Sequence, residues 1–219
     1  MLPVTEHFVS INGEGPHAGE AALFIRFRGC DLCCSYCDTR WSCTNDAPAE
    51  MMSVNDLSAL AHNTGITNIT LTGGEPLLQR ELPELCAALM RGGHRVEIET
   101  NGSMPIKELA GAKLRPVFTM DYKLPSSGCE DSMLTENFDH LGIHDTVKFV
   151  AGDREDLSCS LEIINKFSLC GKCHIYISPV FGRIDPREIV EFLIENKLNG
   201  VRLQLQLHKF IWPPETRGV

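Results

Sequence analysis

The sequence has no long hydrophobic run, and none of its apolar stretches approaches the roughly 20 residues that span a bilayer. The N-terminal stretch MLPVTEHFVSINGEG lacks the basic start and apolar core of a signal peptide. Positive charge is also scarce, because 20 Lys and Arg residues face 29 Asp and Glu residues, giving a net charge of -9. That balance argues against a nucleic-acid-binding surface. We therefore expect a cytoplasmic protein with no membrane segment and no nucleic-acid partner.

Internal repeats, low-complexity tracts and linkers are absent as well. The 219 residues, 43% hydrophobic and 22% charged, suit one globular domain, so we predict a single domain over residues 1–219. Cysteine, by contrast, is abundant, with ten residues. A secreted disulfide scaffold is usually short and cysteine-dense, whereas this chain is long enough to build a core without disulfides. In a reducing cytoplasm a tight cysteine cluster more often binds metal or performs redox chemistry.

Strand-like runs alternate with helical runs along most of the chain. Strands are predicted at 21–29, 66–72, 95–100, 117–121, 146–150, 174–178 and 201–207. Helices are predicted at 53–65, 77–91, 154–167 and 186–197, and Pro83 favours a start of the second helix near Leu82. Such alternation is typical of an α/β fold with a parallel sheet and right-handed crossovers. Because a closed eight-stranded barrel typically takes about 250 residues, we predict an incomplete TIM-like (β/α) barrel with about six or seven parallel strands. Long loops are predicted at 38–52 and 123–142.

The unusual sequence follows the ends of the predicted strands. A cysteine cluster follows the first strand, TGGEP (72–76) the second and ETNG (99–102) the third. DYK (121–123) follows the fourth strand, and SPVFG (178–182) the sixth. Sites in parallel α/β sheets form at the C-terminal ends of the strands. We therefore expect these segments to lie together at one edge of the sheet.

The cluster places Cys30, Cys33, Cys34 and Cys37 within eight residues. Zinc would use two C-x2-C pairs, but here the pairs abut directly and leave little chain to wrap a tetrahedral ion. A thioredoxin-like redox site would need only one C-x-x-C at a helix start. The third arrangement, C-x3-C-x2-C through Cys30, Cys34 and Cys37, would hold three irons of a [4Fe–4S] cube and leave the fourth iron open for a non-protein ligand. The same spacing cannot start from Cys33, because position 40 is Arg40, so Cys33 is a spare thiol.

The C-x3-C-x2-C spacing after the first strand, with Gly-Gly-Glu-Pro after the second, resembles the radical S-adenosylmethionine (SAM) superfamily. The resemblance implies that the open iron binds the amino and carboxylate groups of SAM. It also implies that the cluster reduces the sulfonium and releases a 5′-deoxyadenosyl radical. Gly73, Gly74 and Glu75 would then meet the methionine moiety of SAM. Two glycines let the backbone approach closely, and a glutamate can accept hydrogen bonds from an ammonium group.

Further segments narrow the resemblance: FVSINGEGPHAG (8–19), RFRGC (26–30), CDT (37–39), TGGEPLLQ (72–79), IETNGS (98–103) and QLHKFIWPPETRGV (206–219). Together, over nearly the whole chain, they resemble the 7-carboxy-7-deazaguanine synthase family. The resemblance implies a lyase of 7-deazapurine biosynthesis, on the queuosine or archaeosine route of tRNA modification, that acts on 6-carboxy-5,6,7,8-tetrahydropterin. It implies hydrogen abstraction at pterin C6, Mg²⁺-assisted ring contraction, loss of ammonia and regeneration of SAM. A flavodoxin or ferredoxin electron donor and a homodimer are also implied.

The resemblance assigns roles residue by residue. Its catalytic residues are Glu14, Arg26, Thr72 and His208. Its substrate-binding residues are Ile11, Asn12, Gly13, Glu14, Arg26, Thr72, His208 and the terminal carboxylate of Val219. Asn12 stands where Gln is usual in the family. Arg26 would bind the substrate carboxylate, a task that suits a planar and permanently charged fork.

The cofactor positions follow from the same resemblance. SAM would meet Gly73, Gly74, Glu75, Glu99, Lys123, Ser178, Pro179, Val180 and Phe181. Asp121-Tyr122-Lys123 stands where the family often has Ser-Pro-Lys, so only Lys123 is carried over. Thr39 would bind Mg²⁺ through a hydroxyl oxygen, a ligand that suits a hard cation.

Two other functions share part of this pattern. A glycyl-radical-enzyme activase has the same cluster spacing, but it acts on a protein backbone glycine and needs an open groove. A non-catalytic zinc-binding module would use the same cysteines. Glu14, Arg26 and the C-terminal segment favour the small-molecule enzyme over both. Cys33 and Cys43 are interpreted as bystanders, and the Cys170/Cys173 pair as ordinary buried cysteines.

Overall fold

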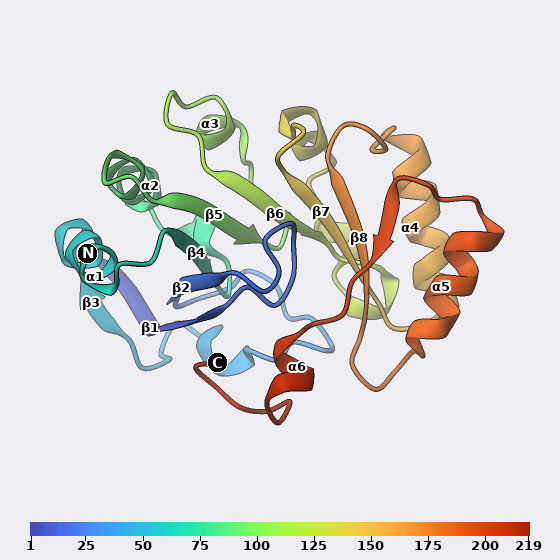
Figure 1. Cartoon of the computed structure of the whole chain (residues 1–219), viewed down its shortest axis with the longest axis horizontal. Coiled ribbons are helices and arrows are strands. Elements are labelled where there is room, and N and C mark those ends of the chain that lie inside the picture. The colour runs from blue at the N-terminus through green and yellow to red at the C-terminus, as the bar shows by residue number, and fades with distance from the viewer.

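The computed structural model describes residues 1–219 and shows one nine-stranded sheet in the order β3-β1-β2-β4-β5-β6-β7-β8-β9. The strands are β1 (Leu2–Ile11), β2 (Ala21–Phe27), β3 (Glu50–Met52), β4 (Asn68–Gly73), β5 (Arg95–Thr100), β6 (Val117–Tyr122), β7 (Thr146–Ala151), β8 (His174–Pro179) and β9 (Val201–Leu203). β2 and β4 through β9 run parallel, while β1 runs antiparallel to both β2 and β3. The sheet ends at β3 and β9 without closing, which confirms the predicted incomplete barrel (Figure 1).

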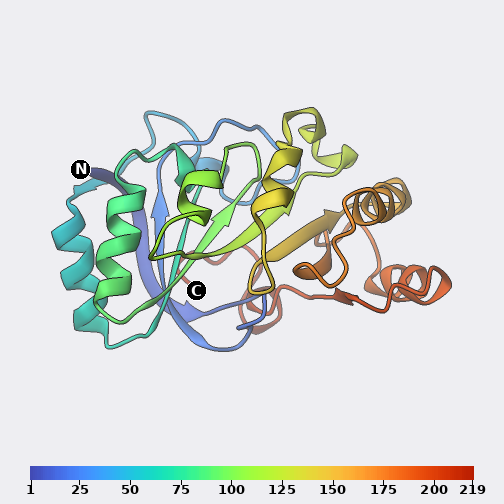
Figure 2. The ribbon, with the colours of Figure 1, turned by 90° about the horizontal axis from the view of Figure 1, so that it is seen from above.

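The longer helices flank the curved sheet on its outer side (Figure 2), whereas the short α6 lies in the C-terminal segment on the cavity side. They are α1 (Val54–Thr64), α2 (Leu82–Arg91), α3 (Lys107–Ala110), α4 (Arg154–Lys166), α5 (Pro186–Glu195) and α6 (His208–Ile211). Local signals set their ends: Ser53 caps α1 in a capping box with Asp56, and α2 begins at Leu82 with Pro83 in its first turn. Asp153 and Asp185 cap α4 and α5 through their side chains.

The central strands divide apolar from polar side chains. On β4, Ile69 and Leu71 belong to the buried apolar core, whereas Thr70 and Thr72 alternate with them. On β7, Val147 belongs to the same core. Because side chains alternate along a strand, the polar set faces the opposite side of the sheet, toward the barrel interior. The fold therefore lines its interior with hydroxyl and charged groups rather than with apolar ones.

Several elements differ from the predictions. The sequence pattern does not predict β1, and the predicted loop at 38–52 contains β3 and a 3-10 helix at Arg40–Ser42. The predicted loop at 123–142 holds three further 3-10 helices. The predicted strand at 201–207 ends at Leu203; Gln204 N still donates to Ile177 O of β8 at 3.0 Å, while the Gln204 side-chain amide exchanges hydrogen bonds with the backbone of Gly15. No helix in the structure combines the length and apolar character needed to cross a membrane.

Candidate active site

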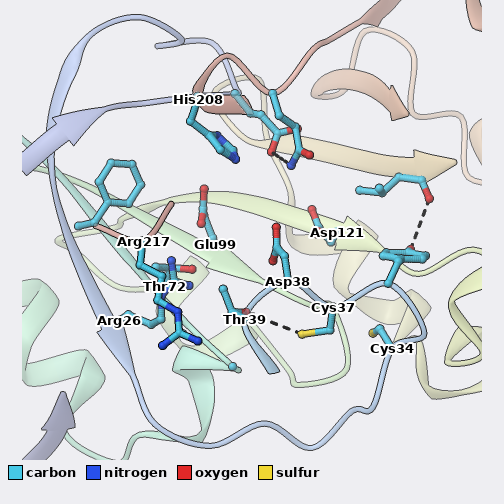
Figure 3. A pocket seen from close by; sticks show the side chains of 18 of the residues that line it. Arg26, Cys34, Cys37, Asp38, Thr39, Thr72, Glu99, Asp121, His208 and Arg217 are labelled. Carbon is cyan, nitrogen blue, oxygen red and sulfur yellow. Dashed lines mark hydrogen bonds between the residues drawn. The ribbon is translucent and has the colours of Figure 1, made fainter. Parts of the chain in front are cut away.

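A cavity of about 560 Å³ lies where the parallel strands end. Its volume falls within the roughly 300–1,000 Å³ typical of small-molecule sites. The structure brings most of the predicted site residues to its wall: Ile11, Gly13, Glu14, Arg26, Cys30, Cys34, Cys37, Thr39, Thr72, Gly73, Gly74, Glu99, Lys123, Val180, Phe181, His208 and Val219. Figure 3 shows Arg26, Thr72 and Glu99 on neighbouring strands, with His208 across the cavity from them.

Four predicted residues do not line this cavity: Asn12, Glu75, Ser178 and Pro179. The Asn12 side chain is buried, accepts a hydrogen bond from the Thr70 hydroxyl at 3.0 Å, and borders a separate small cavity. This placement directs Asn12 into the barrel interior, away from the predicted substrate contact. Ser178 is fully buried and donates to Glu14 Oε1 at 2.9 Å. It supports a cavity residue instead of facing the cavity itself.

Glu75 joins two turns at the edge of the sheet instead of facing the cavity. Its buried carboxylate accepts hydrogen bonds from Leu77 N at 2.9 Å, Asn101 N at 2.7 Å and the Thr100 hydroxyl at 3.0 Å. Burial raises the pKa of Glu75 to about 7, and these hydrogen bonds oppose the rise. Glu75 therefore ties the Gly-Gly-Glu-Pro turn to the Glu-Thr-Asn-Gly turn and fixes the wall of the cavity. The predicted direct contact with the ammonium group of SAM does not match this placement.

Gly74 allows this turn to pack against the cysteine loop. A Cβ at this position would lie 2.2 Å from the Gly29 carbonyl oxygen and 2.6 Å from Cys30 Cβ. Glu75 N also donates to the same Gly29 oxygen at 2.9 Å. Because the obstructing atom is backbone, a larger residue would displace the cysteine loop. The second glycine of the motif is thus required by loop packing beside the cavity.

The cysteine loop presents three motif thiols to the cavity and leaves the fourth outside. Cys30, Cys34 and Cys37 line the cavity, whereas Cys33 is exposed and does not. No group of three or more His, Cys, Asp or Glu side chains gathers as it would around a single metal ion. A cube offers each thiolate a separate iron, so its ligands stand further apart than those of one zinc ion.

Three other cysteines bear on the predictions. Cys43 also lines the cavity, and its Sγ lies 4.0 Å from Cys37 Sγ. Cys43 therefore lies beside the cluster site, although the sequence interpretation treats it as a bystander. In the second pair, Cys173 is buried as predicted. Cys170 is exposed, because it lies in the turn between α4 and β8, and the prediction that both are buried is wrong for it.

Arg26 is aimed by a residue from the unpredicted strand β1. The antiparallel register places Glu6 beside Arg26, and Arg26 Nε donates to Glu6 Oε1 at 2.8 Å. Both side chains are largely buried, with 14% and 19% of their surface exposed. The terminal guanidinium nitrogens of Arg26 make no hydrogen bond within the protein. On the other side Thr72 is the parallel neighbour of Arg26, so a fork and a hydroxyl lie next to each other on the cavity wall.

Opposite charges alternate across the floor of the cavity. Lys148 Nζ lies 3.0 Å from Glu14 Oε2 and 3.1 Å from Asp121 Oδ1. The other Asp121 oxygen lies 2.9 Å from Lys123 Nζ. Glu14, Lys148, Asp121 and Lys123 thus form a row that we call the charge row. Burial alone would lower the pKa of Lys148, but Asp121, Glu14 and Glu99 outweigh burial and hold it well above its ordinary value.

Glu99 lies beside the charge row and lines the same cavity. Burial raises the pKa of its carboxyl group, while the Lys148 ammonium and the Thr72 hydroxyl oppose the rise. Glu99 thus adds a buried carboxyl group to the cavity wall beside the charge row.

The C-terminal segment 204–219, here called the tail, covers the cavity. Leu207 N donates to the Gly13 carbonyl at 3.1 Å, and the next residue, His208, packs so closely on Gly13 that a Cβ there would meet His208 Nδ1 at 2.6 Å. Burial lowers the pKa of His208, although Glu14 opposes the effect, which favours a neutral imidazole in the site. Tail residues from Pro214 to Val219 complete the lining.

The tail is also fastened to the loop that follows the cysteines. Lys209 Nζ lies 3.5 Å from Asp38 Oδ2, and the guanidinium carbon of Arg217 lies 4.4 Å from the centre of the Trp41 ring. Asp38 and Trp41 flank Thr39, the predicted Mg²⁺ ligand. The substrate end of the cavity and the cysteine loop are therefore held together by the last residues of the chain.

Sequence reasoning missed several residues of this wall: Glu6, Asp38, Trp41, Lys148, Gln206, Lys209 and Arg217. One signal was available for Lys148, since a lysine inside the run TVKFV is unusual for a strand expected to be buried on both faces. Glu6 gave no such signal, because its strand was itself unpredicted. The tail residues gave none, because their positions depend on a contact across the whole chain.

Comparisons with known proteins agree with this geometry. The family model of the radical SAM superfamily matches residues 24–122. The chain is 50% identical over 217 residues to the 7-carboxy-7-deazaguanine synthase of Clostridium acetobutylicum, covering 99% of this chain and 98% of that protein. It is 35% identical over 233 residues to the 7-carboxy-7-deazaguanine synthase of Koribacter versatilis, covering 100% of both. The crystal structure of QueE from Escherichia coli matches with a TM-score of 0.74 at 24% identity, covering 94% of this chain and 93% of that one.

Proposed function

The chain belongs to the 7-carboxy-7-deazaguanine synthase family of radical SAM enzymes, and we propose that it converts 6-carboxy-5,6,7,8-tetrahydropterin to 7-carboxy-7-deazaguanine with loss of ammonia. As a radical SAM lyase it acts in 7-deazapurine biosynthesis and uses a [4Fe–4S] cluster and SAM. The observation that carries the proposal is the shared wall of one cavity: three motif cysteines, the Arg26 fork and Glu14 all face the same space.

The residues present fit a site-differentiated cluster. Cys30, Cys34 and Cys37 supply three thiolates at the cavity wall, while Cys33 is turned away to the surface. Gly74 packs against the loop so tightly that the loop is fixed next to the Gly-Gly-Glu-Pro turn. When bound there, the cluster and SAM supply the 5′-deoxyadenosyl radical that removes a hydrogen atom from the substrate. The remaining work of the chain is to bind, orient and enclose the substrate.

Arg26 and Thr72 suit the substrate carboxylate. Glu6 engages Nε of Arg26 and leaves the two terminal nitrogens in the geometry of a bidentate carboxylate contact. The Thr72 hydroxyl adds a donor from the adjacent strand. On the opposite side, Glu14 is an acceptor for the polar edge of the pterin, and His208 meets the same loop as a neutral imidazole. These contacts hold a planar, acid-bearing heterocycle in one orientation.

We also propose Mg²⁺ at Thr39, an electron donor such as flavodoxin or ferredoxin, and a homodimeric assembly. Thr39 lines the cavity and its hydroxyl lies 3.8 Å from Cys37 Sγ, so a cation there would sit beside the cluster loop. A hydroxyl oxygen suits Mg²⁺, which keeps most of its other ligands from water and substrate. When bound, Mg²⁺ supplies a Lewis acid for a substrate oxygen.

Anaerobic turnover tests the proposal directly. The cluster-loaded protein is incubated with SAM, reductant, Mg²⁺ and 6-carboxytetrahydropterin, and the products are identified by mass spectrometry. We expect the deazapurine acid to form while SAM is not consumed. Absence of product, with iron and SAM binding verified, would refute the assignment.

The two rivals give different outcomes in the same sample. A glycyl-radical-enzyme activase must admit a protein backbone, but the tail from Pro214 to Val219 lines and covers this cavity. An activase would consume SAM only when a protein substrate is added. A zinc-binding module would give a colourless protein carrying zinc, whereas one cube gives a brown protein with about four irons per chain.

A further inference from the structure

Lys148 is a buried cation that lies between the two ends of the cavity. It lies on β7, inside the barrel, with 10% of its side-chain surface exposed. Its ammonium nitrogen contacts one carboxylate from the loop after β1 and one from β6, at 3.0 and 3.1 Å. Placing an ammonium group away from water is unfavourable unless partners compensate for the lost hydration. Apolar packing would fill this position at lower cost, so the charge itself calls for an explanation.

Its two partners serve different parts of the cavity. Glu14 faces the proposed substrate, and besides Lys148 it is held only by the neutral donors Ser178 and Gln206, at 2.9 and 3.1 Å. Asp121 is held on its other oxygen by Lys123 at 2.9 Å. Loss of Lys148 would therefore remove the only cation from Glu14 but leave Asp121 with a cation. The charge row is therefore asymmetric, because Glu14, at the proposed substrate end, depends on a single cation.

We propose that Lys148 is a positioning residue, which fixes the Glu14 carboxylate for the substrate and joins it through Asp121 to Lys123 on the SAM side of the cavity. This inference rests on the proposed function, because it assigns Glu14 to the pterin. Lys148 lines the cavity, but its ammonium group is engaged by Glu14 and Asp121, so the role assigned to it is to position Glu14. It acts by holding the Glu14 carboxylate in one orientation before the substrate arrives, which reduces the ordering required on binding.

Tyr176 of β8 is the parallel neighbour of Lys148, and charged groups from several other elements lie around the Lys148 ammonium group. They are Glu14 from the loop after β1, Glu99 from β5, Asp121 from β6 and His208 from the tail, with Lys123 beyond Asp121. Among them Glu99 has no other cation against it, and Lys148 opposes the rise of its pKa on burial.

The test compares Lys148→Met with Lys148→Arg in the cluster-loaded enzyme. We expect Lys148→Met to raise KM for the pterin by about ten-fold or more, because one charge-assisted contact to Glu14 is lost. The values of kcat and of the Kd of SAM should change by less than about three-fold. Lys148→Arg should restore most of the KM, because it keeps the charge. The matched control is Thr146→Val, a buried position on the same strand and face whose hydroxyl has no hydrogen-bond partner. It should leave both constants unchanged.

A double-mutant cycle separates positioning from general damage. Pterin binding is measured at equilibrium for Lys148→Met, for Glu14→Gln and for the double variant. In the double variant neither position carries a charge, so no buried charge is left unpaired at either of them. We expect the loss from Lys148→Met to disappear in the Glu14→Gln background. Additive losses, or equal losses of pterin and SAM affinity, would overturn the positioning role. A wild-type enzyme that fails to bind the pterin would instead overturn the proposed function, and this inference with it.

Discussion

Glu97 offers a quantitative test of how the barrel interior tolerates charge. It lies on β5, two residues before Glu99, and accepts a hydrogen bond from the Thr119 hydroxyl. It also borders the small cavity of about 20 Å³ near Asn12, which has room for about one water molecule. Burial, with help from the charge of Glu99, raises the pKa of Glu97 from 4.5 to about 7. No cation contacts it directly.

The sign of the effect on stability follows from this shift. The folded protein holds the Glu97 proton more tightly than the unfolded chain, so ionisation costs folding free energy. The cost is absent below about pH 4.5, grows as the pH rises, and is complete above about pH 7. At about 1.4 kcal/mol for each pKa unit, its upper value is about 3 kcal/mol. Because a water in the small cavity can solvate the carboxylate in part, we expect about 1–3 kcal/mol.

Glu97→Gln removes the ionisation and keeps an oxygen to accept from Thr119. We expect the variant to melt about 2–12 °C above the wild type at pH 8, from 2–4 °C per kcal/mol for a chain of this size, and to match it near pH 4. Anaerobic thermal unfolding at both pH values measures the difference. Glu191→Gln, an exposed position on α5, is the control and should shift melting at neither pH. A pH-independent gain, or a loss at pH 8, would refute the reasoning.

Three further predictions concern the active site. Cys34→Ala should lose the cluster iron and all SAM cleavage, whereas Cys33→Ala should keep most of both. Iron analysis and a SAM cleavage assay measure the two properties, and equal losses in both variants would contradict the assignment of Cys30, Cys34 and Cys37 as ligands. Arg26→Lys keeps the charge but not the fork, so the pterin KM should rise by about ten-fold or more with a smaller change in kcat, and an unchanged KM would exclude a bidentate contact. Thr39→Ala should raise the Mg²⁺ concentration for half-maximal turnover, while Thr39→Ser should not; equal Mg²⁺ requirements would remove Thr39 as a ligand.

The fold could be predicted largely because its parallel strands are short, β-branched and separated by helices with clear caps. β1 has an equally simple pattern, yet its pairing with β2 spans a nine-residue loop, 12–20, instead of a two-residue hairpin turn. That missing strand carries Glu6, so the sequence could identify Arg26 but not the group that aims it. A partner across a strand pair depends on register, which a single residue does not reveal.

The motif residues show a second limit. Glu75 and Asn12 are in the segments that carry the family resemblance, yet their side chains brace the cavity wall and the barrel interior. A motif fixes which residues are near a site, but hydrogen-bond partners decide whether each faces it. The backbone N–H of Asn101 and the hydroxyl of Thr100, both in the Thr-Asn-Gly turn, donate to the Glu75 oxygens and hold them within the protein. Distinguishing the two roles required the positions of those donors.

The net charge of -9 gives no indication of how charge is arranged inside the cavity. Most of the cations that line it are paired with carboxylates of the same wall: Arg26 with Glu6, Lys123 and Lys148 with Asp121, and Lys209 with Asp38. A cavity neutralised in this way cannot select an acid by a strong positive field, because each cation already faces an anion at short range. Selection must instead come from direction. Glu6 takes only Nε of Arg26, so a carboxylate in the plane of the remaining fork gains two hydrogen bonds that a misplaced one does not.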